Sequence, residues 1–119
     1  MTHKLHPHCK LWISSEDNEG VFGDGKWRLL KAIEEKGSLK KAAESLGISY
    51  RKAWGDIKKA ETGLGVTFLE KTRGGSHGGH SVLTPVARQW IEMYDAFRTD
   101  LEARLNESFH TIFSSIENN

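Results

Sequence analysis

The chain has 119 residues, of which 37% are hydrophobic and 28% are charged, as is usual for a single globular domain. No apolar run exceeds three residues and residues 1–10 lack a hydrophobic segment, so the sequence predicts neither a membrane span nor a secretory signal. The single cysteine, Cys9, excludes an internal disulfide and suits a reducing cytoplasm, where we expect the protein to reside.

Positive charge is concentrated in the middle of the chain, although the net charge is only +1. Residues 38–80 hold eight Lys and Arg against four Asp and Glu, whereas residues 1–37 are balanced and residues 81–119 carry a net charge of −3. This distribution predicts one anion-facing surface on a protein that is otherwise neutral or acidic.

Two short strands and a helix are predicted in the first third of the chain. Apolar residues recur at every second position of residues 9–13, which indicates a strand, and residues 21–22 can form a second strand after a polar loop. Asp24 is expected to cap a helix over residues 26–36, and Gly37 is expected to end it in a left-handed conformation.

A helix-turn-helix is predicted to follow. Ser38 is placed to cap its first helix, and Gly47 to allow the sharp turn after it. Ser49 then caps a second helix, the recognition helix, in which Ala53 and Ile57 are expected to face the core. The expected inner face of the first helix consists of Leu39, Ala42, Ala43 and Leu46.

A glycine-rich hairpin and a long helix complete the predicted fold. Strands at residues 66–71 and 81–83 flank a segment with four glycines and no apolar residue, which predicts a β-hairpin, or wing, with a basic tip. Thr84 is expected to cap the last helix, and Pro85 occupies the first helical position, where proline is preferred.

Apolar residues recur every three or four positions along that last helix. A helix of about 30 residues is roughly 45 Å long, more than a small core can cover, so we expect a second copy to pack against it. The alternative is a break near Asn106 that folds residues 109–116 back onto the core. The residues expected to form the dimer contact are Tyr94, Phe97, Leu101, Leu105, Phe109 and Ile112.

The predicted fold class is mainly α with a small β-sheet: a winged helix-turn-helix with a long C-terminal dimerisation helix. We expect a flexible N-terminus over residues 1–8 and a DNA-binding domain over residues 9–84. The dimerisation helix and a tail are expected over residues 85–119.

The recognition helix and the wing are the candidate DNA interface. A helix N-terminus with Arg and Lys suits phosphates and base edges, and a basic tip beside it can reach the DNA backbone or the minor groove. A helical hairpin with a solvated charged face is the alternative, and for Trp54 a contact with the core or the wing is favoured over DNA. The candidate DNA-binding residues are Ser38, Lys40, Ser49, Tyr50, Arg51, Lys52, Trp54, Lys58, Lys71, Arg73, Gly74, Gly75, Ser76 and His77.

Neither a metal site nor an active site is predicted. Four side chains of metal-ligand type crowd the N-terminus, but Pro7 disrupts their presentation, and a His-rich terminus without metal is favoured. We find no phosphate-binding loop of the G-x-x-x-x-G-K type and no paired carboxylates placed in a pocket, so we expect no cofactor and no enzyme activity. The four ligand-type residues are His3, His6, His8 and Cys9.

Four segments resemble known bacterial regulators. Residues 37–43 (GSLKKAA) and 64–74 (LGVTFLEKTRG) are similar to the DNA-binding domain of LysR-type regulators. Residues 48–54 (ISYRKAW) and 72–84 (TRGGSHGGHSVLT) are more similar still to ModE-type molybdate-responsive transcriptional regulators, which pair such a recognition helix with such a wing. The resemblance covers roughly residues 9–105 and implies a winged-helix dimer that binds a palindromic operator and often represses molybdate-transport genes.

Full-length ModE-type regulators also carry molybdate-binding, Mop-like domains with a SARN-type motif, which these 119 residues lack. The chain is therefore expected to be the DNA-binding half alone, with double-stranded DNA and a second copy as its partners and no membrane partner. A separate molybdate-binding protein is a further candidate partner. Two other functions stay open: direct binding of molybdate or another oxyanion, and a winged helix that binds a partner protein.

Overall fold

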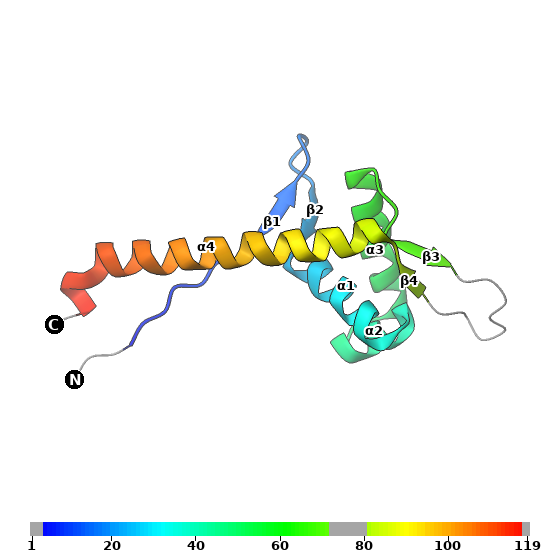
Figure 1. Ribbon diagram of the computed structural model, residues 1–119, viewed down its shortest axis with the longest axis horizontal. Coiled ribbons are helices and arrows are strands. Elements are labelled where there is room, and N and C mark those ends of the chain that lie inside the picture. Colours follow the sequence, from blue (N-terminus) through cyan, green and yellow to red (C-terminus); the bar gives the residue numbers. More distant parts are fainter. Residues whose placement is uncertain (1–3, 72–80, 118–119) are drawn as a thin grey trace.

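The described part of the chain forms a helical head from which one long helix extends (Figure 1). The computed structural model describes residues 4–71 and 81–117. Its elements in chain order are β1 (Trp12–Ser14), β2 (Gly20–Gly23), α1 (Asp24–Lys36), α2 (Leu39–Leu46), α3 (Tyr50–Leu64), β3 (Leu69–Lys71), β4 (Ser81–Leu83) and α4 (Pro85–Glu117). β1 pairs with β2 and β3 with β4, both antiparallel, so the predicted fold class, mainly α with little sheet, is confirmed.

The helix-turn-helix forms as the sequence predicts. Ser38 caps α2, its hydroxyl oxygen accepting a hydrogen bond from the Lys41 N–H (3.1 Å). Gly47 ends α2 in the left-handed region (φ 70°), which lets the chain turn at once toward α3. Ser49 caps α3 in the same way, accepting from the Lys52 N–H (3.0 Å). Both caps and the turn glycine are therefore confirmed.

Aromatic side chains join the first hairpin to α4. Phe22 of β2 is 1% exposed, and its ring centroid lies 5.1 Å from those of Trp90 and Tyr94 on α4. Phe68, just before β3, meets the Phe22 ring edge-on with the centroids 6.1 Å apart. One aromatic cluster thus holds three regions that lie far apart in the sequence.

α4 is one continuous helix over Pro85–Glu117 and begins as predicted. The Thr84 hydroxyl donates to the Thr67 carbonyl (2.6 Å) and accepts from the Ala87 N–H (3.2 Å), so Thr84 caps α4 and ties it to the chain before β3. The unbroken helix rules out the alternative of a break near Asn106. Across the described ranges, no helix combines the length and the hydropathy that crossing a bilayer requires.

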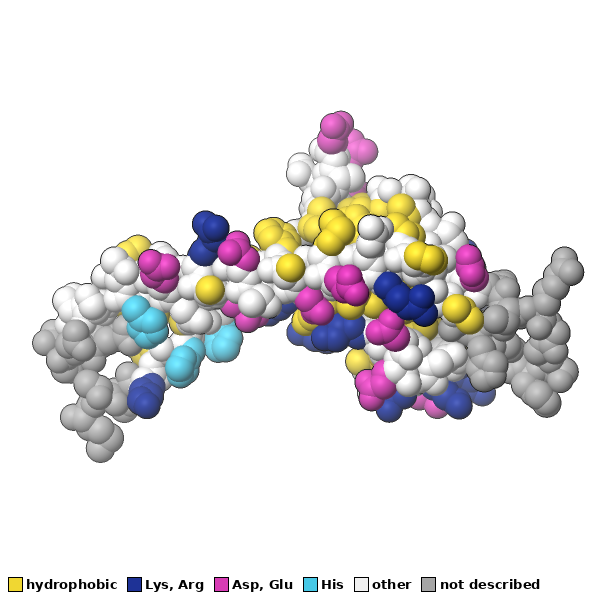
Figure 2. Space-filling model, viewed as in Figure 1, with side chains coloured by type: hydrophobic (Ala, Val, Ile, Leu, Met, Phe, Trp, Pro, Cys, Tyr) yellow, Lys and Arg dark blue, Asp and Glu magenta, His cyan; other side chains and the backbone are white. Residues whose placement is uncertain are grey.

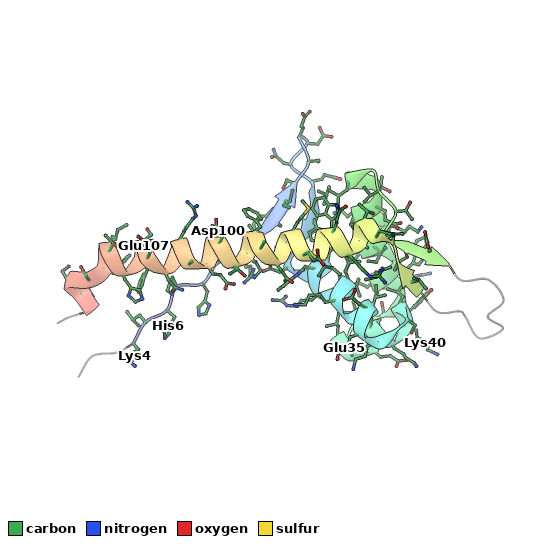
Figure 3. The ribbon with its side chains drawn as sticks, in the orientation of Figure 1. Lys4, His6, Glu35, Lys40, Asp100 and Glu107 are labelled. Carbon is green, nitrogen blue, oxygen red and sulfur yellow. The ribbon has the colours of Figure 1, made fainter. Side chains whose placement is uncertain are left out.

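The N-terminal segment (residues 4–11) runs beside the outer part of α4 (residues 97–117), here called outer α4 (Figure 1). His6 and Cys9 of this segment line a hollow of 340 Å³ together with Leu105 and neighbouring residues of α4. Figure 3 shows Asp100 and Glu107 pointing away from the segment, on the other side of α4. Outer α4 is therefore bordered by the N-terminal segment on one side and carries acidic side chains on the other.

Two local predictions are wrong. Gly23, not Asp24, occupies the cap position of α1, and Asp24 is the first helical residue. The Asp24 carboxylate instead accepts hydrogen bonds from the Tyr94 hydroxyl and from Arg98 on α4, both at 2.7 Å, so a contact across the fold replaces the local cap. Leu46 is 38% exposed rather than buried, because α2 ends at the surface where the chain turns.

These contacts of Asp24 predict a stability loss that depends on pH. Burial alone would raise the pKa of Asp24, but the hydrogen bonds from Tyr94 and Arg98, with the charge of Arg98, outweigh it and hold that pKa below its ordinary value. Folding therefore favours the ionised carboxylate, whose contribution is complete above about pH 4 and is lost as the pH falls through the folded-state pKa. Asp24→Asn should cost about 1–2 kcal/mol at neutral pH and almost nothing in strong acid.

Urea unfolding at a series of pH values measures this difference. The control is Asp100→Asn, because Asp100 is exposed and pairs with the exposed Arg104 (3.0 Å). This control should change the free energy of unfolding by less than about 0.5 kcal/mol at every pH. If Asp24→Asn costs as much in acid as at neutral pH, packing rather than charge explains the loss.

Candidate nucleic-acid interface

α3 turns one face to the core and the other to solvent. Ala53, Ile57 and Ala60 lie at helical spacing and are at most 2% exposed, which confirms the predicted buried face. Tyr50 and Trp54, on the solvent side, are 54% and 46% exposed. The outer face of α3 is therefore free to enter a groove of a ligand such as duplex DNA.

Cations dominate the solvent side of α2 and α3. Lys52 forms an ion pair with Asp56 (2.9 Å) and Lys58 with Glu61 (3.3 Å), so these two lysines are partly neutralised. Other exposed cations make no ion pair within the described residues and leave the surface positive. These cations are Lys40, Lys41, Arg51 and Lys59.

The remaining candidate residues fall into two groups. Ser38 and Ser49 direct their hydroxyl oxygens at backbone N–H groups, so their first role is to fix the starts of α2 and α3. Lys71 is the last residue of β3. The other wing candidates lie outside the described residues: Arg73, Gly74, Gly75, Ser76 and His77.

Trp54 is not a core residue, so the core contact predicted for it is wrong, while the alternative contact with the wing involves residues outside the described ranges. Its side chain is 46% exposed, and the Lys58 ammonium lies 5.4 Å from the centroid of its ring. The reason is that Ala53 and Ile57 already fill the face of α3 that meets the core. Trp54 therefore adds a flat, apolar surface to the cationic side of α3.

Glu61 anchors the wing to α3. Its carboxylate accepts hydrogen bonds from the backbone N–H groups of Phe68 (2.7 Å) and Leu69 (3.3 Å), where β3 begins. β3 then pairs with β4, with Leu69 opposite Leu83. The position of the wing strands is thus fixed relative to the recognition helix. Helical periodicity carries no signal for this role of Glu61, and the sequence did not predict it.

The first hairpin packs tightly against the other flank of α3. A Cβ atom built on Gly63 of α3 would overlap the side chain of Val21 on β2, so only glycine permits this approach. Figure 1 shows β1 and β2 on one side of α3 and β3 and β4 on the other. The recognition helix is therefore flanked by two hairpins.

A family model of known proteins matches this part of the chain: that of the bacterial regulatory helix-turn-helix proteins of the lysR family matches residues 25–88. The chain belongs to this family. The match runs from the first turn of α1 into the first turn of α4, and so contains the whole helix-turn-helix and the wing strands.

Curated relatives place this LysR-family domain with the ModE type. The transcriptional regulator ModE of Haemophilus influenzae is 33% identical over 106 residues, which are 88% of this chain and 40% of the relative. The DNA-binding transcriptional dual regulator ModE of Escherichia coli K12 is 37% identical over 88 residues, 73% of this chain and 34% of the relative. The molybdenum-pterin-binding protein MopB of Rhodobacter capsulatus is 32% identical over 85% of this chain. The chain spans two fifths or less of the length of these relatives.

Solved structures agree on the fold. The crystal structure of a CbnR DNA-binding domain in complex with DNA matches with a TM-score of 0.51 and 25% identity, covering 67% of this chain and 92% of that one. A mutant of OxyR from Corynebacterium glutamicum matches with a TM-score of 0.53 and 23% identity, covering 71% and 25% of the two chains. The chain is thus a winged helix-turn-helix domain of the LysR family that is similar in sequence to regulators named ModE.

Outer α4 of this LysR-family domain lies beyond the family match and carries an apolar face. The prediction that Tyr94 contacts a second copy is wrong: Tyr94 is 2% exposed, and its hydroxyl donates within the chain, to Asp24 (2.7 Å) and to the Leu11 carbonyl (2.9 Å). The apolar face begins one turn later. Its exposed or half-buried members are Phe97, Leu101, Leu105, Phe109 and Ile112.

The N-terminal histidines do not form a recognisable metal site in the part of the chain that the structure describes. Figure 2 shows histidine side chains along the N-terminal segment and outer α4. No three ligand-type side chains come together within residues 4–71 and 81–117 in a way that would hold a metal ion. His3, the remaining member of the predicted cluster, lies outside these ranges.

Proposed function

We propose that this chain is a sequence-specific DNA-binding regulator that binds a palindromic operator as a homodimer and controls genes for the transport of molybdate or a related oxyanion. The observation that carries DNA binding is the exposed, cationic face of α3 in a LysR-family domain. Arg51 lies in the first turn of α3 and makes no ion pair with another described residue, so it can reach phosphates and base edges. The link to molybdate rests on relatives named ModE and MopB.

The homodimer is supported by the apolar face of outer α4. Phe97 and Ile112 are 47% and 69% exposed, and α4 continues far beyond the head (Figure 1). A second copy of α4, related by a two-fold axis, would bury this apolar face without any other partner protein. Two heads related by that axis suit half-sites one helical turn of DNA apart, about 34 Å, or a multiple of it.

An electrophoretic shift assay tests DNA binding directly. The probes are the DNA upstream of the gene for this chain and the DNA upstream of a neighbouring transporter gene. Preferential retardation of one probe over a scrambled duplex of equal length supports a sequence-specific regulator. Equal affinity for all duplexes, or none, overturns the proposal and favours a winged helix that binds a partner protein.

Arg51→Ala should lower operator affinity by about 1–3 kcal/mol and relax base preference at one position of each half-site. Fluorescence anisotropy with the operator and with single-base variants of it measures both effects. The control is Arg104→Ala, because Arg104 lies on outer α4 and its side chain is 75% exposed. Unchanged affinity and selectivity for Arg51→Ala would remove Arg51 from the interface.

A further inference from the structure

A basic hollow lies where the first hairpin, the start of α1 and α3 meet. Its volume is 440 Å³, and we call it the hairpin groove. Trp12 of β1 lines it, as do Lys52 and Asp56 of α3. Three further cations line it: Lys10, Lys26 and Arg28. None of the resemblances in the sequence pointed to this groove, and Lys10 and Trp12 lie before the family match.

Positive charge in the hairpin groove is neutralised only in part by the acids that line it. Asp24 is engaged by Tyr94 and Arg98, and Asp56 by Lys52. The other lining cations, Lys10, Lys26 and Arg28, make no ion pair in the described ranges. The two lining acids are thus already paired, which leaves the three other lining cations without an ion pair in the described ranges, so the groove suits an anion.

Lys26 is one of the cations that line the groove. It is half-buried in the first turn of α1. Burial lowers the pKa of Lys26 and the charges of Lys59 and Lys52 lower it further, although Asp56 opposes them. Burial and these two lysines of the recognition helix together outweigh Asp56. An anion bound beside Lys26 would therefore stabilise its charged form.

Trp12 supplies a flat wall. Its side chain is 62% exposed, which is unusual because tryptophan side chains are largely buried in most proteins. It lies over Gly20 and Gly23 of β2, where a Cβ atom at Gly23 would come within 2.8 Å of the Trp12 Cβ. The absence of a side chain at Gly23 therefore permits the close approach of β1 and β2 at Trp12, whose exposed ring lines the groove, where a sugar ring can pack on it.

We propose that the hairpin groove binds the sugar-phosphate backbone of operator DNA, on the flank of α3 opposite the wing. Lys26 contacts a phosphate and Trp12 packs on the adjoining deoxyribose. This inference rests on the proposed function. An extended polyanion fits because Lys52 and Asp56 belong both to the lining of the groove and to α3, so DNA bound along α3 lies close to the groove.

The test compares Lys26→Gln with Lys31→Gln in operator binding by the full chain over a range of salt concentrations. Lys31 is the matched control: it lies on the same helix, and it faces α4 through Asp95 (4.0 Å) and the Trp27 ring (3.9 Å). Loss of one phosphate contact should flatten the plot of log affinity against log salt by about 0.9 for Lys26→Gln. Its deficit relative to wild type should then shrink about 3.5-fold on a fourfold rise in salt.

Two more measurements make the test specific. Ethylation interference should show wild-type contacts to phosphates on the flank away from the wing, and Lys26→Gln should lose these contacts alone. Lys26→Arg, which restores the charge, should restore the slope. Thermal unfolding of each variant shows that a change in binding is not a change in folding.

The outcomes separate this proposal from the proposed function. A salt slope for Lys26→Gln equal to that of Lys31→Gln overturns the groove assignment, while operator preference by the wild type leaves the regulator intact. Titration calorimetry of the free chain with molybdate tests whether the groove binds a small oxyanion instead. A heat of binding that is lost in Lys26→Gln would assign the groove to an oxyanion and overturn binding of the DNA backbone. Absence of operator preference in the wild type would instead refute the proposed function itself.

Discussion

Replacing Leu101 and Leu105 with glutamate should convert a homodimer into a monomer and weaken operator binding by at least about 100-fold. Both side chains are half-buried within the single chain, and they are one helical turn apart on outer α4. Burying one leucine at an interface contributes about 1.5–3 kcal/mol, and a carboxylate in its place adds a desolvation cost. The loss of affinity follows because two linked heads bind far more tightly than one head alone, typically by about 100-fold or more.

Light scattering at micromolar concentration measures the mass, and fluorescence anisotropy measures operator affinity. The matched control is Thr99→Glu with Ala103→Glu, which adds the same charge to exposed positions on the other side of α4. This control should remain dimeric. A monomeric mass for the wild-type chain would contradict the dimer and, with it, the palindromic operator.

Phe22→Ala should be the most destabilising single substitution that the described contacts predict. Phe22 is 1% exposed and meets Phe68, Trp90 and Tyr94, so its removal leaves a cavity where both hairpins meet α4. Truncation of a buried phenylalanine costs about 3–5 kcal/mol, a large part of the stability of a domain this small.

Urea unfolding at one fixed protein concentration measures the loss from Phe22→Ala, because dimerisation makes stability depend on concentration. Tyr50→Ala is the control, since Tyr50 is an aromatic residue that is 54% exposed and should change stability by about 0.5 kcal/mol or less. Phe22→Leu, which refills part of the cavity, should recover part of the loss. A cost below about 1 kcal/mol for Phe22→Ala would mean that the aromatic cluster is not what holds the first hairpin.

Elements that short-range chemistry determines could be predicted from the sequence. Ser38 and Ser49 cap their helices and Gly47 turns the chain, because each role depends on the residue type and on neighbours within four positions. The buried face of α3 follows from the 3.6-residue period, which places Ala53 and Ile57 on one side. Local rules were sufficient for the helix-turn-helix.

Contacts between distant residues could not be predicted in this way. Asp24 has the residue type and position of a cap, but it pairs with Tyr94 and Arg98 some 70 positions away. The same pairing buries Tyr94, which helical periodicity had assigned to the dimer face. Glu61 and the hairpin groove are further cases, because their partners come from separate elements that only the folded chain brings together.

The unbroken course of α4 has a mechanical consequence for regulation. At 1.5 Å per residue, its 33 residues make a stiff rod about 50 Å long, anchored to the head at one end by Tyr94 and Thr84. In the proposed dimer, a tilt of about 4° at the far end of such a rod displaces the other end by about 3.4 Å, one base-pair step of DNA. A signal that changes the crossing of the two rods by a few degrees would therefore move the two recognition helices out of register with their half-sites.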